Sequence, residues 1–178
     1  ANTTNNLFTL SPSAEGTYQF KVRASEANVS MSDSNVATIT LDSSNPQVIS
    51  TSPSNGTQNV ENSPQLRINF SEPIHLASAP FNASGNIAPC NPSHKISLRK
   101  SNTDFCMPLV LQNSADQLSE LVFELPNDFS LISGLTYILS AHQGIADLSG
   151  NELQQTHEIE FTVQNIGNAL INKINLFA

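Results

Sequence analysis

The residues best suited to chemistry are two carboxylates and a short polar turn. Asp147 begins the sequence Asp-Leu-Ser-Gly-Asn, which ends at Asn151, and Glu72 lies in an earlier segment. Closely spaced oxygen atoms of this kind suit a hard cation such as calcium. The same residues are good turn formers, because Asp and Asn side chains bond their own backbone and Gly150 accepts a positive φ. A calcium site and a simple turn both stay open as interpretations.

Cys90 and Cys106 are the only cysteines of the chain, and each stands beside a proline or a Met-Pro pair. Together with His94 they would supply only three of the four ligands of a structural zinc site, so we expect a disulfide. Closing a loop of this size contributes about 3 kcal/mol to stability in an oxidising compartment. The alternative is a pair of free thiols in a cytosolic protein.

Little else in the sequence could catalyse a reaction. The histidines form no His-x-x-x-His pair, and neither a Gly-x-Ser-x-Gly motif nor a Gly-rich phosphate loop occurs. The nearness of Cys90 to His94 is a weak hint of a Cys-His pair, for which coincidence is the simpler explanation. We therefore expect no enzyme. The four histidines are His75, His94, His142 and His157.

The composition excludes two classes of partner. The net charge is -8 at pH 7 with seven basic residues, which leaves no electrostatic footprint for nucleic acid. No stretch approaches the roughly 20 apolar residues that cross a bilayer, so we expect no membrane span. Charged residues make up only 12% of the chain while Ser, Thr and Asn are abundant. Such a composition suits strands and turns and is typical of secreted proteins.

Several asparagines begin an Asn-x-Ser/Thr sequon, which in a glycosylating organism marks a sugar site on an exposed surface. A chain this rich in Asn and Ser contains such sequons by composition alone. The glycosylation candidates are Asn2, Asn28, Asn55 and Asn82.

The elements that must position these residues are strands. After residue 46 the chain contains seven short strand candidates separated by Ser-, Asn-, Pro- and Gly-rich turns, which predicts a β-sandwich. Residues 130–133 predict a single helical turn. Residues 76–93 contain three prolines and no period, and they predict a long insertion held by the disulfide. The strand candidates are residues 47–51, 65–70, 95–99, 109–112, 120–124, 135–141 and 158–163.

The first segment predicts a separate, incomplete unit over residues 1–45. Strict alternation places Tyr18, Phe20, Val22 and Ala24 on one face, as in a half-buried strand. A polar loop follows, and then a second strand of β-branched residues ends at Leu41.

The last segment, residues 166–178, is too short to cross a membrane and too apolar for a free tail. We expect it to begin a following module, to cover an edge of the sandwich or to pair with another chain. The residues predicted to serve assembly are Tyr18, Phe20, Val22, Ile166, Leu170, Ile174 and Phe177.

The middle of the chain resembles a known family. The sequence PQVISTSPSNG at residues 46–56, LRINFSEPI at 66–74, LTYIL at 135–139 and IADLSGNEL at 145–153 are similar to the bacterial Ig-like domain of S-layer and other surface proteins. The resemblance covers about residues 46–164 and implies an all-β, Ig-like sandwich.

The chain departs from that pattern in two places, one between these motifs and one before them. A Cys-containing insertion at residues 76–107 has no counterpart in the usual pattern. Residues 16–24, followed by Ser-Asp-Ser-Asn and a final strand, resemble the last third of a fibronectin type III domain. The expected fold is one complete module at residues 46–165 after a partial one, whose early strands were removed or are supplied by another polypeptide.

The resemblance also bears on Asp42, which opens the linker sequence Asp-Ser-Ser-Asn-Pro. Similar Asp-containing linkers in bacterial Ig-like arrays can hold ions that stiffen successive modules. Asp42, Asp147 and Asn151 are therefore the candidate calcium ligands, with a flexible linker as the alternative for Asp42.

Three functions follow as hypotheses, the first being a non-catalytic structural or adhesive module of an extracellular bacterial surface protein. Its partners would be neighbouring modules and a host or cell-wall ligand. The second is a subunit of an extracellular filament, in which identical subunits complete one another by strand donation. The third is an accessory binding module of a secreted hydrolase, although the chain lacks Trp and has only 6% aromatic residues for a sugar platform.

Overall fold

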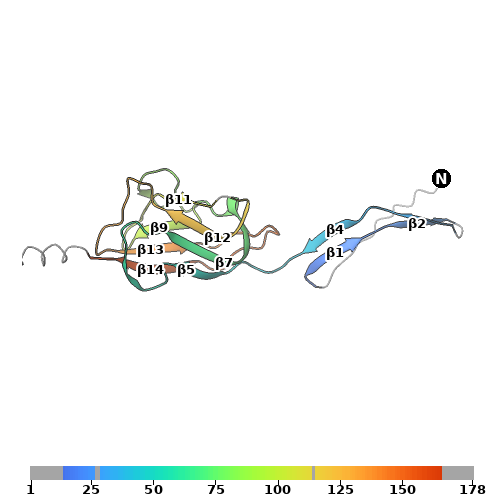
Figure 1. Cartoon of the computed structure of the whole chain (residues 1–178), viewed down its shortest axis with the longest axis horizontal. Coiled ribbons are helices and arrows are strands. Elements are labelled where there is room, and N and C mark those ends of the chain that lie inside the picture. Colours follow the sequence, from blue (N-terminus) through green and yellow to red (C-terminus); the bar gives the residue numbers. More distant parts are fainter. Residues whose placement is uncertain (1–13, 27–28, 114, 166–178) are drawn as a thin grey trace, which may run out of the picture. The chain divides into compact units, whose positions relative to one another are not determined.

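A computed structural model describes residues 14–26, 29–113 and 115–165 of the chain. The described elements are strands apart from one short 3-10 turn, so the fold is all-β, in agreement with the prediction. The chain divides into two units, Ala1–Ser44 and Asn45–Ala178, which Figure 1 draws as a hairpin and a layered domain.

The N-terminal unit consists of two pairs of antiparallel strands. β1 (Gly16–Phe20) pairs with β4 (Ala37–Leu41), and β2 (Arg23–Glu26) pairs with β3 (Val29–Asp33). The polar loop expected between the outer strands is therefore wrong, because most of it is paired as β2 and β3.

Hydrogen bonds around Val22 connect the two strand pairs. The Ser34 amide donates to the Val22 carbonyl at 2.8 Å, and the Val22 amide donates to the Ser34 hydroxyl at 2.9 Å. Tyr18 and Phe20 are half-buried with their rings stacked 6.5 Å apart, as the alternation predicts. Val22 is 71% exposed, which corrects its expected burial. In the described part of this unit, each of the two sheets has only two strands.

The C-terminal unit is a sandwich of two sheets. One sheet has the strand order β6-β14-β13-β9-β10-β8 and the other β11-β12-β7-β5. Neighbouring strands are antiparallel except β14 and β6. The strands are β5 (Val48–Ser52), β6 (Thr57–Val60), β7 (Leu66–His75), β8 (Ala88–Pro89), β9 (Ile96–Lys100), β10 (Phe105–Cys106), β11 (Val110–Leu111), β12 (Gln117–Glu124), β13 (Thr136–Ala141) and β14 (His157–Val163).

Each of the seven predicted strands has a counterpart here, whereas β6, β8 and β10 were not predicted. The helical turn expected at residues 130–133 is wrong, since the described 3-10 turn is η1 (Leu76–Ser78). Hydrogen bonds to residues outside the expected segment hold it in another conformation. The Leu131 amide donates to the Asn62 carbonyl at 2.7 Å, and the Ile132 amide donates to the Tyr137 hydroxyl at 3.0 Å.

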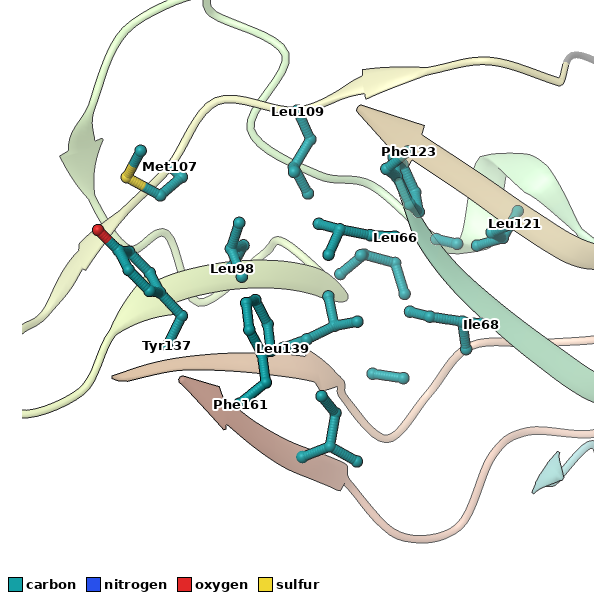
Figure 2. Close-up of a cluster of buried hydrophobic side chains, with 14 of the residues drawn as sticks. Leu66, Ile68, Leu98, Met107, Leu109, Leu121, Phe123, Tyr137, Leu139 and Phe161 are labelled. Carbon is teal, nitrogen blue, oxygen red and sulfur yellow. The ribbon is translucent and has the colours of Figure 1, made fainter. Parts of the chain in front are cut away.

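The core lies between the two sheets, as the buried side chains of Figure 2 show. Along β7 the burial alternates, so that Leu66, Ile68 and Phe70 point inward. Leu139 and Phe161 are buried from the opposite sheet. Each such side chain contributes about 1.5–3 kcal/mol when it is fully buried. This core makes the sandwich the rigid frame on which the candidate sites are built.

Candidate functional site

Asp147 lies between β13 and β14, in the segment whose sequence is compatible with either a turn or a calcium site. Its amide donates to the Asn151 carbonyl at 2.9 Å, and the Asn151 amide donates back to Asp147 Oδ1 at 2.8 Å. The Asn151 side-chain nitrogen donates to Asp147 Oδ2 at 2.9 Å. Gly150 has a φ of 89°, which the turn requires. The two predicted residues are therefore brought together as partners in a turn.

The Asp147 carboxylate is buried but stays ionised at neutral pH. Burial raises its pKa, and hydrogen bonds from Asn151 and from the backbone of Ser149 and Gly150 outweigh that effect. The net result is a pKa below the ordinary value of 3.8. Donors that stabilise a carboxylate in this way also fix where its oxygens point.

A second carboxylate lies close to this turn. An isolated bridge joins Asp147 to Ile74, and Glu72 stands two residues earlier in β7. A carboxylate oxygen of Glu72 lies within 4.8 Å of one of Asp147. Two negative charges at this separation repel each other, and a cation bound to both would remove that repulsion. This acidic cluster could therefore bind a metal ion.

Asp42, the remaining predicted ligand, belongs to the end of the N-terminal unit. Its carboxylate accepts a hydrogen bond from the Ser44 amide at 3.0 Å, in the manner of an Asx turn. Its role in metal binding stays a prediction.

The disulfide predicted between Cys90 and Cys106 is confirmed, with an S–S distance of 2.10 Å and a Cα–Cα distance of 4.9 Å. It joins the chain just after β8 to the end of β10, so it fastens the insertion to its neighbouring strand. Both sulfurs are oxidised, which removes Cys90 as a nucleophile beside His94.

The histidines are scattered along the sequence, but two of them line one pocket of about 540 Å³ together with Ser97. These two are His94 and His142, which come together because β13 pairs with β9. The Nδ1 atom of His94 is buried and has no hydrogen-bond partner within the part of the chain that the structure describes. The ring of His142 lies 3.0 Å from the Ser97 hydroxyl.

The pKa of His142 lies below its usual 6.5, chiefly because the half-buried ring is poorly solvated when charged. Glu158 opposes this shift. The positive charges of Lys95 and Arg99 add to it. No signal in the sequence could have predicted this pairing, since residues 94 and 142 meet only through the sheet register.

The sugar-site candidates differ in accessibility. Asn55 is exposed, and its Oδ1 accepts a hydrogen bond from the Glu160 amide at 2.9 Å. Asn82 is only 5% exposed, and its side-chain nitrogen donates to the carbonyls of Asn86 and Cys106. Its expected exposure is therefore wrong. Asn2 and Asn28 lie outside the described residues.

The predicted assembly residues Ile166, Leu170, Ile174 and Phe177 also lie outside the described residues. Among those described, no helix has the length and apolar character needed to span a bilayer.

Comparison with known proteins settles the family of the chain. The family model described as "Bacterial Ig-like domain" matches residues 42–163. The chain belongs to this family. The match confirms the resemblance seen in the sequence, and it begins at Asp42, a few residues before the first resembling motif. No curated protein matches the chain.

Solved structures similar to this bacterial Ig-like domain protein include CopC from Methylosinus trichosporium OB3b. It is 21% identical, with 67% of this chain and 94% of that chain covered and a TM-score of 0.47. The N-terminal part of the bacterial S-layer protein SbsC is 19% identical, with 67% of this chain and 24% of that chain covered and a TM-score of 0.42. In the longer structure rSbsC(31-844), also 19% identical and with a TM-score of 0.42, 67% of this chain matches only 14% of the S-layer chain.

Proposed function

We propose that this chain is a non-catalytic structural module of an extracellular bacterial surface protein. The observation that carries the proposal is the bacterial Ig-like sandwich with its insertion tied by the disulfide of Cys90 and Cys106. Disulfides persist in oxidising compartments outside the cytosol, and a sandwich with a continuous core resists unfolding without a cofactor. A second β unit directly before it supports a tandem arrangement of modules.

In this role the sandwich serves as a spacer or adhesive element, and its partners are neighbouring modules and a host or cell-wall ligand. Antibodies raised against the purified chain test the location. They should label intact cells of the source bacterium without permeabilisation. Labelling that appears only after the envelope is opened would contradict the proposal.

We also propose calcium as the ion for the acidic cluster of Glu72 and Asp147, with Asn151 as a further ligand. Calcium prefers carboxylate and amide oxygens, and the Asp147 carboxylate stays ionised. Calcium should raise the unfolding temperature and EDTA should lower it again, because an ion that binds only the folded state stabilises it.

Glu72→Gln should abolish the calcium response, because it removes one of the two carboxylates of the cluster. Glu61→Gln, at an exposed carboxylate of the same unit, is the matched control and should leave the response intact. An unfolding temperature that changes with neither calcium nor EDTA would exclude the ion site, and Asp147 would then serve the turn alone.

A second function, self-assembly through strand donation, is favoured by the N-terminal hairpin. Its sheets have only two strands each in the described part of the chain, so the edges of β1 and β4 are open to a further strand. Val22, Val36 and Ile39 of this unit are exposed. Size-exclusion chromatography with light scattering distinguishes the two functions, since a monodisperse monomer at all concentrations excludes the filament.

A further inference from the structure

An apolar groove lies at one end of the sandwich, away from the acidic turn. Its volume is about 230 Å³, and Met107 and Tyr137, which Figure 2 places at one end of the buried cluster, form part of its lining. Three large side chains on its walls are exposed, Ile87 at 50%, Phe105 at 54% and Ile132 at 60%. A cluster of exposed apolar residues around a groove indicates a binding surface more often than single apolar residues scattered over the protein do.

The walls of the groove are held in place by contacts that need no occupant. The disulfide joins Cys90 to Cys106, and β8 pairs with β10, so the two walls that carry Ile87 and Phe105 are held together. On the other side, the Ile132 amide donates a hydrogen bond of 3.0 Å to the Tyr137 hydroxyl, which fixes the loop that carries Ile132. A groove held in this way binds its occupant without a large ordering cost.

The size of the groove limits what can occupy it. Pockets for small-molecule ligands begin at about 300 Å³ and carry a few convergent polar groups. This groove is smaller, and its lining is dominated by apolar and aromatic side chains. It suits one or two large apolar side chains of a peptide segment.

The chain itself delivers such a segment to this end of the sandwich. After β14, the Gly134 amide donates to the Val163 carbonyl at 3.2 Å, and the Ser133 hydroxyl donates to the Gln164 carbonyl at 2.7 Å. The Asn165 side chain lies against Gly134. The described chain therefore ends beside the loop that carries Ile132, a wall of the groove.

The segment that follows has the chemistry of the missing occupant. Within residues 166–178, Ile166, Leu170, Ile174 and Phe177 are spaced four, four and three residues apart, which would place them on one side of a helix. Lys173 is the only charged residue of the segment. Even at the ~1.5 Å per residue of a helix the segment is long enough to cross a groove of this size.

We propose that the groove binds residues 166–177 of the same chain through this apolar side. Attachment next to Ile132 gives the segment an effective concentration of about the millimolar range or higher, which favours its own groove over that of another copy. Docking covers Ile87, Phe105 and Ile132 and sets the direction in which the chain leaves the sandwich. This inference stands independently of the proposed function, because it requires no particular location or ligand.

Hydroxyl-radical footprinting with mass spectrometry on the full chain tests the proposal. In the variant Ile166→Ser/Leu170→Ser/Ile174→Ser/Phe177→Ser, oxidation of Phe105 and Ile132 should rise about tenfold or more, since each lost apolar contact weakens docking by about that factor. Ile49 and Leu148, which are exposed elsewhere in the same unit, should react at unchanged rates. The matched control Ile171→Ser/Leu176→Ser changes apolar residues off the proposed side and should leave Phe105 and Ile132 protected.

The groove side provides a reciprocal test that does not alter the segment. Ile132→Asp changes an exposed residue, so the sandwich should keep its circular dichroism spectrum, while amide exchange across residues 167–177 should accelerate about tenfold toward the rate of a free peptide. Equal oxidation of Phe105 in the wild type and the fourfold variant would overturn the proposal. Protection that appears only at high protein concentration would also overturn it, because the occupant would then be a second copy.

Discussion

The two units of this chain use the same alternation of apolar and polar residues, but only one of them buries its apolar face. Ile68 in β7 is 1% exposed, whereas Ile39 in β4 is 57% exposed. Both are β-branched residues in the middle of a strand. The face of β7 is covered by a second sheet, whereas β4 pairs only with β1 in the described part of its unit. Alternation thus identifies the apolar side of a strand, and the presence of another layer decides whether that side is buried.

The largest expected effect comes from making the same substitution at both positions. Ile68→Ala should lower the free energy of unfolding of the sandwich by about 2–5 kcal/mol, because it leaves a cavity between two packed sheets. Ile39→Ala should change it by less than about 0.5 kcal/mol, as expected of a surface site. Denaturant unfolding followed by circular dichroism measures both. Equal losses would mean that a covering layer over β4 shares the stability of the sandwich.

The disulfide is a second difference between the two units, because both cysteines of the chain lie in the sandwich. The double variant Cys90→Ala/Cys106→Ala should lose about 3 kcal/mol of unfolding free energy, mainly through greater freedom of the unfolded chain. Reductant should reproduce most of this loss in the wild type. Added to the double variant, the same reductant serves as the control and should have no effect. A wild-type chain whose unfolding midpoint is unchanged by full reduction would contradict the assigned role.

How much could be predicted from the sequence depends on the length of each signal. β7 and β13 were predicted because several alternating residues repeat there and because their motifs resemble a family. β8 and β10 have two residues each, too few to show any period, and they are strands only because the disulfide and their neighbours hold them. A long strand with a regular apolar period can therefore be predicted from the sequence, whereas a two-residue strand depends on tertiary contacts that the sequence does not show.

The candidate sites follow the same division. Asp147 and Asn151 were predicted because they are neighbours in one turn, where the chemistry is local. The closeness of Glu72 to Asp147, the shared pocket of His94 and His142, and the burial of Asn82 all depend on which strands meet. A sequon shows the residues of a sugar site but cannot show whether the folded chain covers the asparagine.

A smaller effect concerns His142, which is half-buried in the sandwich. Because its folded-state pKa lies below 6.5, the unfolded chain takes up a proton more readily than the folded one as the pH falls. This contribution to stability is complete above about pH 6.5 and is lost as the pH falls from there toward the folded-state pKa. His142→Gln keeps a polar group near Ser97 and should lose less stability than the wild type between about pH 7.5 and pH 5.5. Parallel pH profiles of the two proteins would exclude His142 as a source of the acid sensitivity.

The smallest expected effect is a Val→Thr exchange on the exposed hairpin, which keeps the branched shape and adds a hydroxyl. Val22→Thr should change the free energy of unfolding by less than about 0.5 kcal/mol, since water already reaches this side chain. Val163→Thr, at a position 1% exposed, is the matched contrast and should cost about 1–3 kcal/mol, because the hydroxyl would be desolvated in the core. Light scattering of the same two variants extends the comparison to assembly. If Val22→Thr leaves the sandwich folded but shifts an oligomer toward monomers, the exposed face of the hairpin is covered by another chain in the wild type. If the wild type and Val22→Thr are both monomers at every concentration, the hairpin is exposed in solution and the spacer function is favoured.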